Sequence, residues 1–257
     1  MPKWTAFPFE NIGFRHDLVG LKKHWRRLHV GDAEPWPKDK AAQAAWVLFH
    51  AGDFQKAHAA GLAAGSAGTT VANKAQAIYA HYLERSEQVK LAMFQAVLAR
   101  AEAQAAQEPA NANAWYWQAY ALGRYSQSIS VAKALSQGFG AKVKHALETT
   151  LQLAPKHADA HVALGAFHAE VIDKVGKLLG ATQGADGPTG LKLFQKALKL
   201  NPSSAIGRVE YANGLVMLEG DKHMALAETL YAEAAACTPA DAMECLDIAM
   251  AQAELNE

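Results

Sequence analysis

The feature that most constrains this chain is a recurring frame in which a proline is followed three positions later by a small residue. The frame occurs four times, at Pro109, Pro155, Pro202 and Pro239. A proline cannot continue the helix before it, because it lacks an N–H group and clashes with the preceding turn. Polar residues just after it, such as Asp159, Ser203 and Ser204, can cap the helix that follows.

Such a chain is a series of helix–break–helix units, each with an apolar face that must be buried against a neighbouring unit. No segment alternates β-branched and polar residues, as a half-buried strand would. The sequence therefore predicts an all-α fold, an α-α superhelix of stacked helical hairpins.

The overall composition argues against nucleic acid as a partner and against insertion into a membrane. Lys and Arg together number 25, equal to Asp and Glu together, so the formal net charge is zero and no global field draws the protein to nucleic acid. No apolar run reaches the roughly 18 residues that span a bilayer, which argues against membrane insertion. Cys237 and Cys245 are too few for a disulfide framework, and the N-terminus lacks a secretory signal pattern, so we expect a cytoplasmic protein.

Several segments resemble the tetratricopeptide repeat (TPR) at matching places. Residues 52–57 (Gly-Asp-Phe-Gln-Lys-Ala) and 220–225 look like the turn and the opening of its second helix. Residues 194–202 (Phe-Gln-Lys-Ala-Leu-Lys-Leu-Asn-Pro) resemble its end, and residues 163–166 resemble its first helix. The resemblance covers roughly residues 40–257. It implies a TPR-like solenoid that binds a protein segment rather than catalysing a reaction.

The repeats are longer than those of a standard TPR protein. Successive prolines of the frame are 46, 47 and 37 residues apart, against about 34 in the standard repeat. We expect the extra length of the first two units to lie between their two helices, at residues 125–139 and 171–190. The run from Leu164 to Val171, with apolar residues up to Phe194, is similar to the lengthened repeats of the microtubule-dynamics regulator family and of the T component of tripartite transporters. That narrower resemblance implies an alternative function, an accessory subunit of a transport or small-molecule-binding system that self-associates through the two insertions.

Residues 1–38 have a different pattern and are expected to form an aromatic N-terminal cap, with the helical-repeat domain at residues 39–257. An apolar stripe at helical spacing is formed by Leu18, Leu21, Trp25 and Leu28. Terminal repeats of a solenoid need such a cover; the alternative is a segment for partner docking or self-association. The opposite face carries four cations, Lys22, Lys23, Arg26 and Arg27. We interpret them as a solvated face rather than as a contact for phosphate or acidic lipid.

Three histidines, His157, His161 and His168, return to nearly one face of a helix and could form a zinc site with Asp159 or Glu170. We interpret them instead as packing or hydrogen-bonded side chains, because His157 precedes the established helix and no His-Glu-x-x-His arrangement supplies a general base. The glycines fit neither a nucleophile elbow nor a phosphate-binding or dinucleotide-binding loop. The sequence thus predicts no enzyme, no metal and no cofactor.

The aromatic segment at residues 115–120 leads into the main candidate for a binding surface. Tyr116, Tyr120 and Arg124 follow one another at i+4 steps and share one helix face. In TPR proteins the corresponding face lines a concave groove, and the resemblance extends this face to other repeats. The candidate groove residues are Trp46, Phe49, His50, Tyr116, Tyr120, Arg124, Asp159, Glu170 and Asn213. We expect a protein or peptide partner, or a small polar ligand, in such a groove; the alternative is that the two tyrosines pack against the next repeat.

Overall fold

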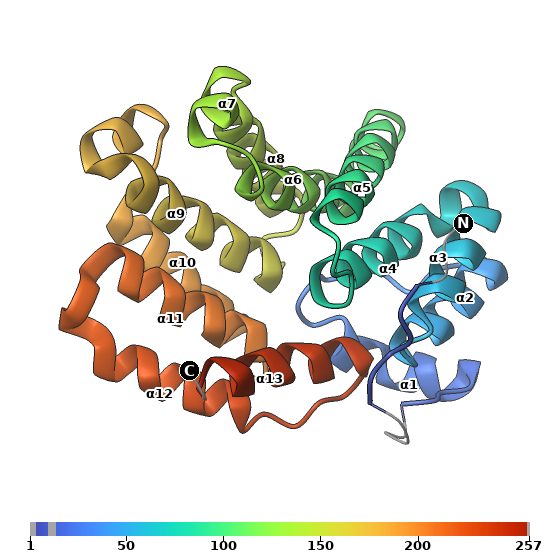
Figure 1. The fold of residues 1–257 in the computed structure, drawn as a ribbon. Coiled ribbons are helices and arrows are strands. Elements are labelled where there is room, and N and C mark those ends of the chain that lie inside the picture. Colours follow the sequence, from blue (N-terminus) through green and yellow to red (C-terminus); the bar gives the residue numbers. More distant parts are fainter. Residues whose placement is uncertain (1–3, 10–13, 256–257) are drawn as a thin grey trace. The chain divides into compact units, whose positions relative to one another are not determined.

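The structure is a computed structural model that describes residues 4–9 and 14–255. Every regular element in that part of the chain is a helix, and it contains no strand (Figure 1). The all-α fold class is therefore confirmed. Parts of the predicted cap, residues 1–3 and 10–13, lie outside the described residues. None of the described helices has the length and apolar character to cross a membrane.

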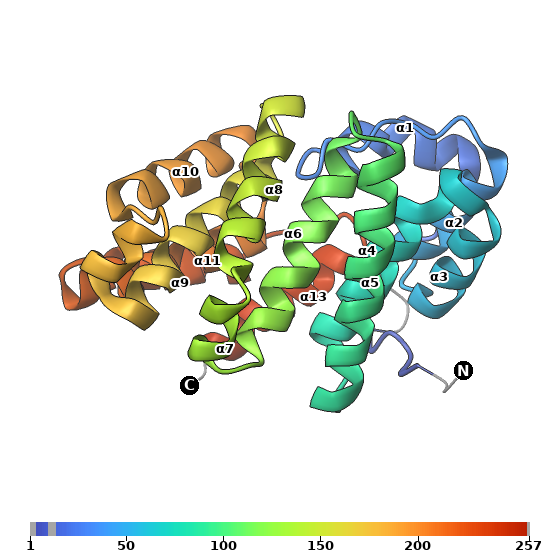
Figure 2. The same ribbon diagram turned by 90° about the horizontal axis from the view of Figure 1, so that it is seen from above.

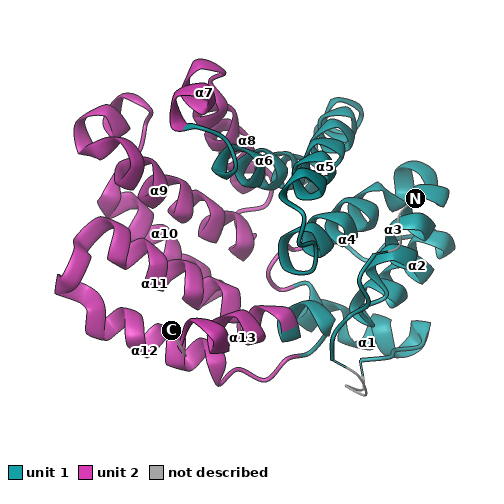
Figure 3. Cartoon of the chain, viewed as in Figure 1, with its two compact units in different colours: residues 1–29, 34–130, 240–245 teal, residues 30–33, 131–239, 246–257 magenta. Residues whose placement is uncertain are grey.

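The chain divides into two compact units, shown in different colours in Figure 3. Unit 1 comprises residues 1–29, 34–130 and 240–245, and unit 2 comprises residues 30–33, 131–239 and 246–257. The helices of unit 1 are α1 (Leu18–Leu28), α2 (Lys40–His50), α3 (Phe54–Ala63), the 3-10 helix η1 (Gly65–Gly68), α4 (Thr69–Tyr82), α5 (Glu87–Gln107) and α6 (Ala112–Gln127). The helices of unit 2 are α7 (Val131–Ser136), α8 (Phe139–Leu153), α9 (Ala158–Thr182), α10 (Gly187–Leu200), α11 (Ala205–Glu219), the 3-10 helix η2 (Gly220–His223) and α12 (Met224–Ala235). The last helix, α13 (Ala242–Glu254), begins in unit 1 and ends in unit 2. A domain boundary after residue 38 stays a prediction.

The four prolines of the repeat frame each precede a helix, as predicted. The helices that follow them are α6, α9, α11 and α13, and they begin at Ala112, Ala158, Ala205 and Ala242. Each of these alanines is the small residue three positions after a proline. The frame is therefore a helix-start signal.

Side chains just before the helices accept the backbone N–H groups that a helix start leaves unpaired. Ser204 caps α11 by accepting from the N–H of Gly207, which confirms one predicted cap. The expectation that Asp159 caps α9 is wrong, because Asp159 already lies in the first turn. The cap is His157, whose backbone is extended and whose Nδ1 accepts from the N–H of Ala160 at 3.0 Å.

The two long insertions both contain helix. Residues 125–139 include the short helix α7. The expectation that all of residues 171–190 separate two helices is wrong, because α9 continues through this segment to Thr182. The regular backbone of α9 is interrupted at Gly176, where φ is 78° and ψ is 163°. Only glycine adopts this combination readily, so α9 consists of two helical segments that meet in a kink at Gly176.

In unit 1 the described N-terminal residues pack against the helices that follow them. The ring of Trp4 stacks on Tyr79 of α4, with 4.2 Å between ring centroids. Three of the four predicted stripe residues of α1, Leu21, Trp25 and Leu28, are buried, and Trp25 packs edge-on against Trp46 of α2. The aromatic segment thus covers α2, α3 and α4 of its own unit.

Phe194 of α10 is the centre of the core of unit 2. It is fully buried and stacks on Tyr211 of α11, with 5.5 Å between ring centroids. A Cβ atom added to Gly165 of α9 would lie 3.0 Å from the Phe194 ring, and one added to Gly214 of α11 would lie 2.5 Å from it. The Phe194 ring therefore packs directly against the backbones of α9 and α11, where Gly165 and Gly214 have no side chain.

Candidate partner-binding surface

The candidate groove residues from α2 are buried inside unit 1. Trp46, Phe49 and His50 each have an exposed fraction of 1% or less. The ammonium group of Lys74 lies over the rings of Trp46 and Phe49, and Trp25 of α1 packs edge-on against Trp46 and His50. These three residues stabilise the core of unit 1 and present no surface to a partner.

The candidate residues from α6 form a continuous row. The rings of Tyr116 and Tyr120 lie 6.2 Å apart, and the guanidinium of Arg124 lies 5.4 Å from the centre of the Tyr120 ring. Tyr116 is 7% exposed, whereas Tyr120 and Arg124 are half-buried. A cation over an aromatic face is attracted by the negative charge of the ring's π-system, so Tyr120 holds Arg124 in place. The outer part of this row is open to contact.

Two further side chains from other helices belong to this surface. Helix α5 lies beside both α4 and α6, and in Figures 1 and 2 it runs antiparallel to α6, so the end of α6 lies near the start of α5. His81 at the end of α4 and Lys90 near the start of α5 are placed there by this topology. We call the group Tyr116, Tyr120, Arg124, His81 and Lys90 the α6 surface.

The electrostatics of the α6 surface favour an anion. Burial, followed by the positive charges of Arg124 and Lys90, holds the pKa of His81 well below its ordinary value of 6.5. His81 is therefore neutral at pH 7, and both charges that act on its pKa are cations. Its Nε2 atom is buried and has no hydrogen-bond partner among the described residues. Lys90 also pairs with Glu87 at 2.8 Å, but Glu87 is largely exposed and screened by water.

Sequence reasoning missed His81 and Lys90 because neither stands in a recognisable pattern. A lone histidine and a lone lysine on two different helices carry no spacing that links them to Tyr120. Only the antiparallel order of α4, α5 and α6 brings them to the same end of the unit.

The remaining three candidate groove residues belong to unit 2 and are half-buried. Asp159 donates its backbone N–H to the carbonyl oxygen of Gly31 at 3.0 Å. Glu170 lies on α9, and the side-chain oxygen of Asn213 on α11 accepts the hydroxyl of Tyr231. A groove that joins all nine residues stays a prediction.

The three histidines near Pro155 are hydrogen-bonded within unit 2, as interpreted from the sequence. Besides the cap made by His157, a ring nitrogen of His161 lies 3.1 Å from the carbonyl oxygen of Pro155. Nδ1 of His168 accepts from the N–H of Asp186 at 3.0 Å. Among residues 4–9 and 14–255, no three His, Cys, Asp or Glu side chains are grouped so that they could hold a metal ion.

Comparisons with known proteins show a relationship in fold. The structure is similar to the crystal structure of a thermophilic TPR protein from Thermus thermophilus, with a TM-score of 0.58 and 16% sequence identity. The similarity covers 83% of this chain and 97% of that protein. No protein-family model and no curated protein matches the sequence. The narrower kinship with the transporter T component stays a prediction. The chain therefore has a TPR-like helical-repeat fold.

Proposed function

We propose that the protein is a non-catalytic helical-repeat scaffold that binds an acidic segment of a protein partner at the α6 surface. The observation that supports this most is the stack of Arg124 on Tyr120 beside His81, whose buried Nε2 has no hydrogen-bond partner among the described residues. The fold is consistent with this role, because stacked helical repeats present extended surfaces for binding.

The residue types of the α6 surface suit a carboxylate. A guanidinium forms short, charge-assisted hydrogen bonds to a carboxylate, and here the ring of Tyr120 holds Arg124 in place before a partner arrives. Tyrosine and arginine are also the residues that most often contribute a large share of binding energy in protein interfaces. A carboxylate bound at Arg124 and Lys90 would offset the two positive charges that, after burial, lower the pKa of His81.

We also propose that the protein acts in the cytoplasm. Neither Cys237 nor Cys245 forms a disulfide among the described residues. Proteins of oxidising compartments commonly use their cysteines in disulfides.

The test reverses one charge of the α6 surface. Proteins captured by the tagged wild-type chain are compared with those captured by Arg124→Glu, using quantitative mass spectrometry. We expect the specific partner to be lost, because removing a central interface arginine typically costs about 2 kcal/mol or more, roughly thirtyfold in affinity.

The matched control is Lys174→Glu, which makes the same charge change at an exposed lysine of α9 in unit 2. This variant should capture the partner as the wild type does. Circular dichroism checks that both variants keep their helix content. Equal capture by wild type and Arg124→Glu would refute the assignment of the α6 surface.

A second candidate function is supported by the apolar surface of the two insertions. Val131 and Leu135 on α7 are exposed by 39% and 37%, and Leu178 and Leu179 on α9 by 91% and 46%. Exposed apolar side chains that together form a contiguous patch often mark an interface. We propose as the alternative that a second copy of the chain covers them, which would fit an accessory subunit that self-associates.

Sedimentation equilibrium tests this alternative. The double variant Leu135→Glu/Leu178→Glu should dissociate an oligomer that the wild type forms. Leu62→Glu in unit 1, where Leu62 is 40% exposed, is the control and should leave the oligomer intact. A wild-type chain that stays monomeric at high concentration would rule out the alternative and leave the α6 proposal untouched.

A further inference from the structure

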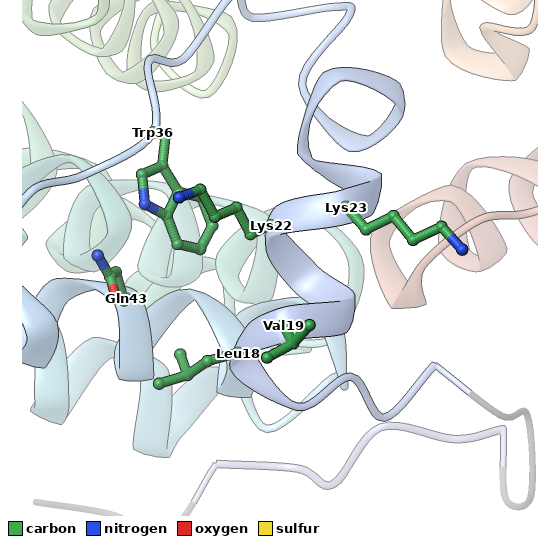
Figure 4. Close-up of a pocket in the computed structure, with 6 residues that line it drawn as sticks. All are labelled: Leu18, Val19, Lys22, Lys23, Trp36 and Gln43. Atoms are coloured by element: carbon green, nitrogen blue, oxygen red, sulfur yellow. The ribbon is translucent and has the colours of Figure 1, made fainter.

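A shallow depression beside α1 combines apolar and cationic side chains in a way that the proposed function does not use. Figure 4 shows its lining residues, which come from α1, from the segment after α1 and from α2. They are Leu18, Val19, Lys22, Lys23, Trp36 and Gln43. Its volume of about 470 Å³ falls in the range of about 300–1,000 Å³ that is usual for binding sites. We call this feature the α1 depression.

The cations at the α1 depression have no acidic partner within the described residues. Lys22 and Lys23, which line the depression, and Arg26, which lies outside its lining, are exposed, and none of them makes an ion pair with a described carboxylate. Helix α1 itself contains no acidic residue. Asp17, at its start, accepts the N–H of Gly20 as the helix cap. The positive charge is thus local and uncompensated, although the whole chain is neutral.

Arg27, on the same helix, differs from Lys22 and Lys23 because it has a carboxylate partner within the chain. Its two terminal nitrogens donate to the two carboxylate oxygens of Glu244 at 2.6 and 2.9 Å. Glu244 neutralises Arg27 within the chain, whereas Lys22 and Lys23 have no described carboxylate partner and can pair with an acidic group of another molecule. Charge complementarity therefore specifies an acidic occupant.

The depression also presents apolar side chains, which favour an apolar group in its occupant. Leu18 is 44% exposed and Val19 is 78% exposed. The ammonium group of Lys22 lies 5.9 Å from the centre of the Trp36 ring, so the lysine chain and the indole form one wall. Gln43 lies on the same side of α1 as Trp36 (Figure 4), and its amide donates to the carbonyl oxygen of Pro37 at 2.8 Å.

We propose that the α1 depression is a second docking site, which takes a large apolar side chain of an acidic protein segment. The apolar side chain rests between Leu18, Val19 and Trp36, and flanking carboxylates of the same segment contact Lys22 and Lys23. The depression has a volume of about 470 Å³, room for one large side chain, which favours a protein segment that inserts such a side chain over an anionic membrane. This site uses none of the residues of the α6 surface.

The experiment selects short random peptides displayed on phage against the immobilised full-length chain. We expect enriched peptides to carry several Asp or Glu residues around a Leu, Phe or Trp. The best of them is synthesised with a fluorescent label, and its affinity is measured by anisotropy. Lys22→Glu/Lys23→Glu should weaken binding about tenfold or more, because like charges then face each other. Val19→Asp should weaken it without touching a cation.

Two controls separate this site from general charge effects and from the α6 surface. Lys38→Glu/Lys40→Glu makes the same charge change at exposed lysines outside the lining residues and should leave the affinity within about twofold. Arg124→Glu should also leave it unchanged, so failure here and failure of the proposed function can be told apart.

Three outcomes would overturn the docking site. The first is an enriched set of peptides without acidic residues, or no enriched set at all. The second is equal affinity for wild type and Lys22→Glu/Lys23→Glu. The third is binding to vesicles that contain phosphatidylserine, lost in Lys22→Glu/Lys23→Glu but kept in Trp36→Ala, which would assign α1 to a lipid surface.

Discussion

Nδ1 of His50 lies 2.7 Å from Oδ2 of Asp241, and both side chains are buried, although 191 residues separate them in the sequence. On its other side, Nε2 of His50 lies 3.2 Å from Nε2 of His29. Burial raises the pKa of Asp241, but the hydrogen bond and charge of His50, with the charge of Lys74, outweigh it and hold the pKa below its ordinary value. An ionised carboxylate thus joins residues 240–245 to α2 within unit 1.

The first prediction concerns this buried pair. Asp241→Asn and His50→Leu should each lower the free energy of unfolding by about 3–5 kcal/mol, because each leaves one buried polar partner uncompensated. The double variant should cost clearly less than the sum, since it removes both groups together. Urea denaturation measures all three. Arg27→Met is the control: the partly exposed Arg27–Glu244 pair should contribute only about 0.2–1 kcal/mol. Additive effects at His50 and Asp241 would contradict the coupling.

The second prediction is a loss of stability as the pH falls below about 6.5. Burial is the largest cause of a lowered pKa at His58, His81, His161 and His168. The unfolded chain therefore binds protons at these sites at a pH where the folded chain does not, so lowering the pH favours unfolding. The melting temperature should be level above pH 7 and fall progressively from about pH 6.5 to the folded-state pKa values.

His81→Gln should make that fall less steep, because one of the four sites no longer titrates. The pKa of Asp241 is lowered below 3.8, so its stabilising contribution is lost only at more acid pH and does not interfere in this window. A melting temperature that rises between pH 7 and pH 5 would show that the histidine assignment is wrong.

The third prediction compares one substitution at two glycines. Gly123 lies inside α6, and a Cβ atom added there meets nothing within 4 Å, so Gly123→Ala should stabilise the protein by about 0.5–1 kcal/mol. A Cβ atom at Gly176 also meets nothing, but the backbone conformation there is strained for any other residue. Gly176→Ala should destabilise by about 1–3 kcal/mol. Thermal melts of the two variants should shift in opposite directions; a shift in the same direction would mean that α9 is regular at residue 176.

The fourth prediction concerns the fit of Phe194 against α11. Gly214→Ala would place a methyl group 2.5 Å from the Phe194 ring, which is fully buried, so it should destabilise by about 1–3 kcal/mol. A smaller side chain at the same point should relieve the clash, so Gly214→Ala/Phe194→Leu should be more stable than the sum of the two single effects. Denaturation curves of the three variants give the free energy of unfolding of each. If the two single effects simply add, the methyl group at residue 214 does not contact the Phe194 ring.

Local signals in the sequence predicted local structure well. The proline frame predicted that helices follow Pro109, Pro155, Pro202 and Pro239, because proline acts on its own neighbours in the chain. The i+4 spacing of Tyr116, Tyr120 and Arg124 predicted the row on α6, since helix geometry alone brings such residues together. The break at Gly176 was not predicted, because glycine permits an unusual backbone angle but does not require one.

Features that depend on contacts between distant parts of the chain could not be predicted from local sequence patterns. The groove positions on α2 were transferred from a standard repeat, in which that face is open. Here Trp25 of α1 covers Trp46 and His50, with ring centroids 5.6 and 6.2 Å away, so the same positions are buried. The pairing of His50 with Asp241 has no sequence signal either, because nothing in the pattern near either residue points to the other.

The composition of unit 1 affects the order of events during synthesis on the ribosome. Arg27 and His50 are translated before their carboxylate partners Glu244 and Asp241, which follow 217 and 191 residues later. The helices that contain Arg27 and His50 therefore lack these two carboxylate partners until residues 240–245 have been synthesised. A chain cut short before residue 240 would lack the parts that finish the first unit it made, which exposes incomplete products to proteolysis.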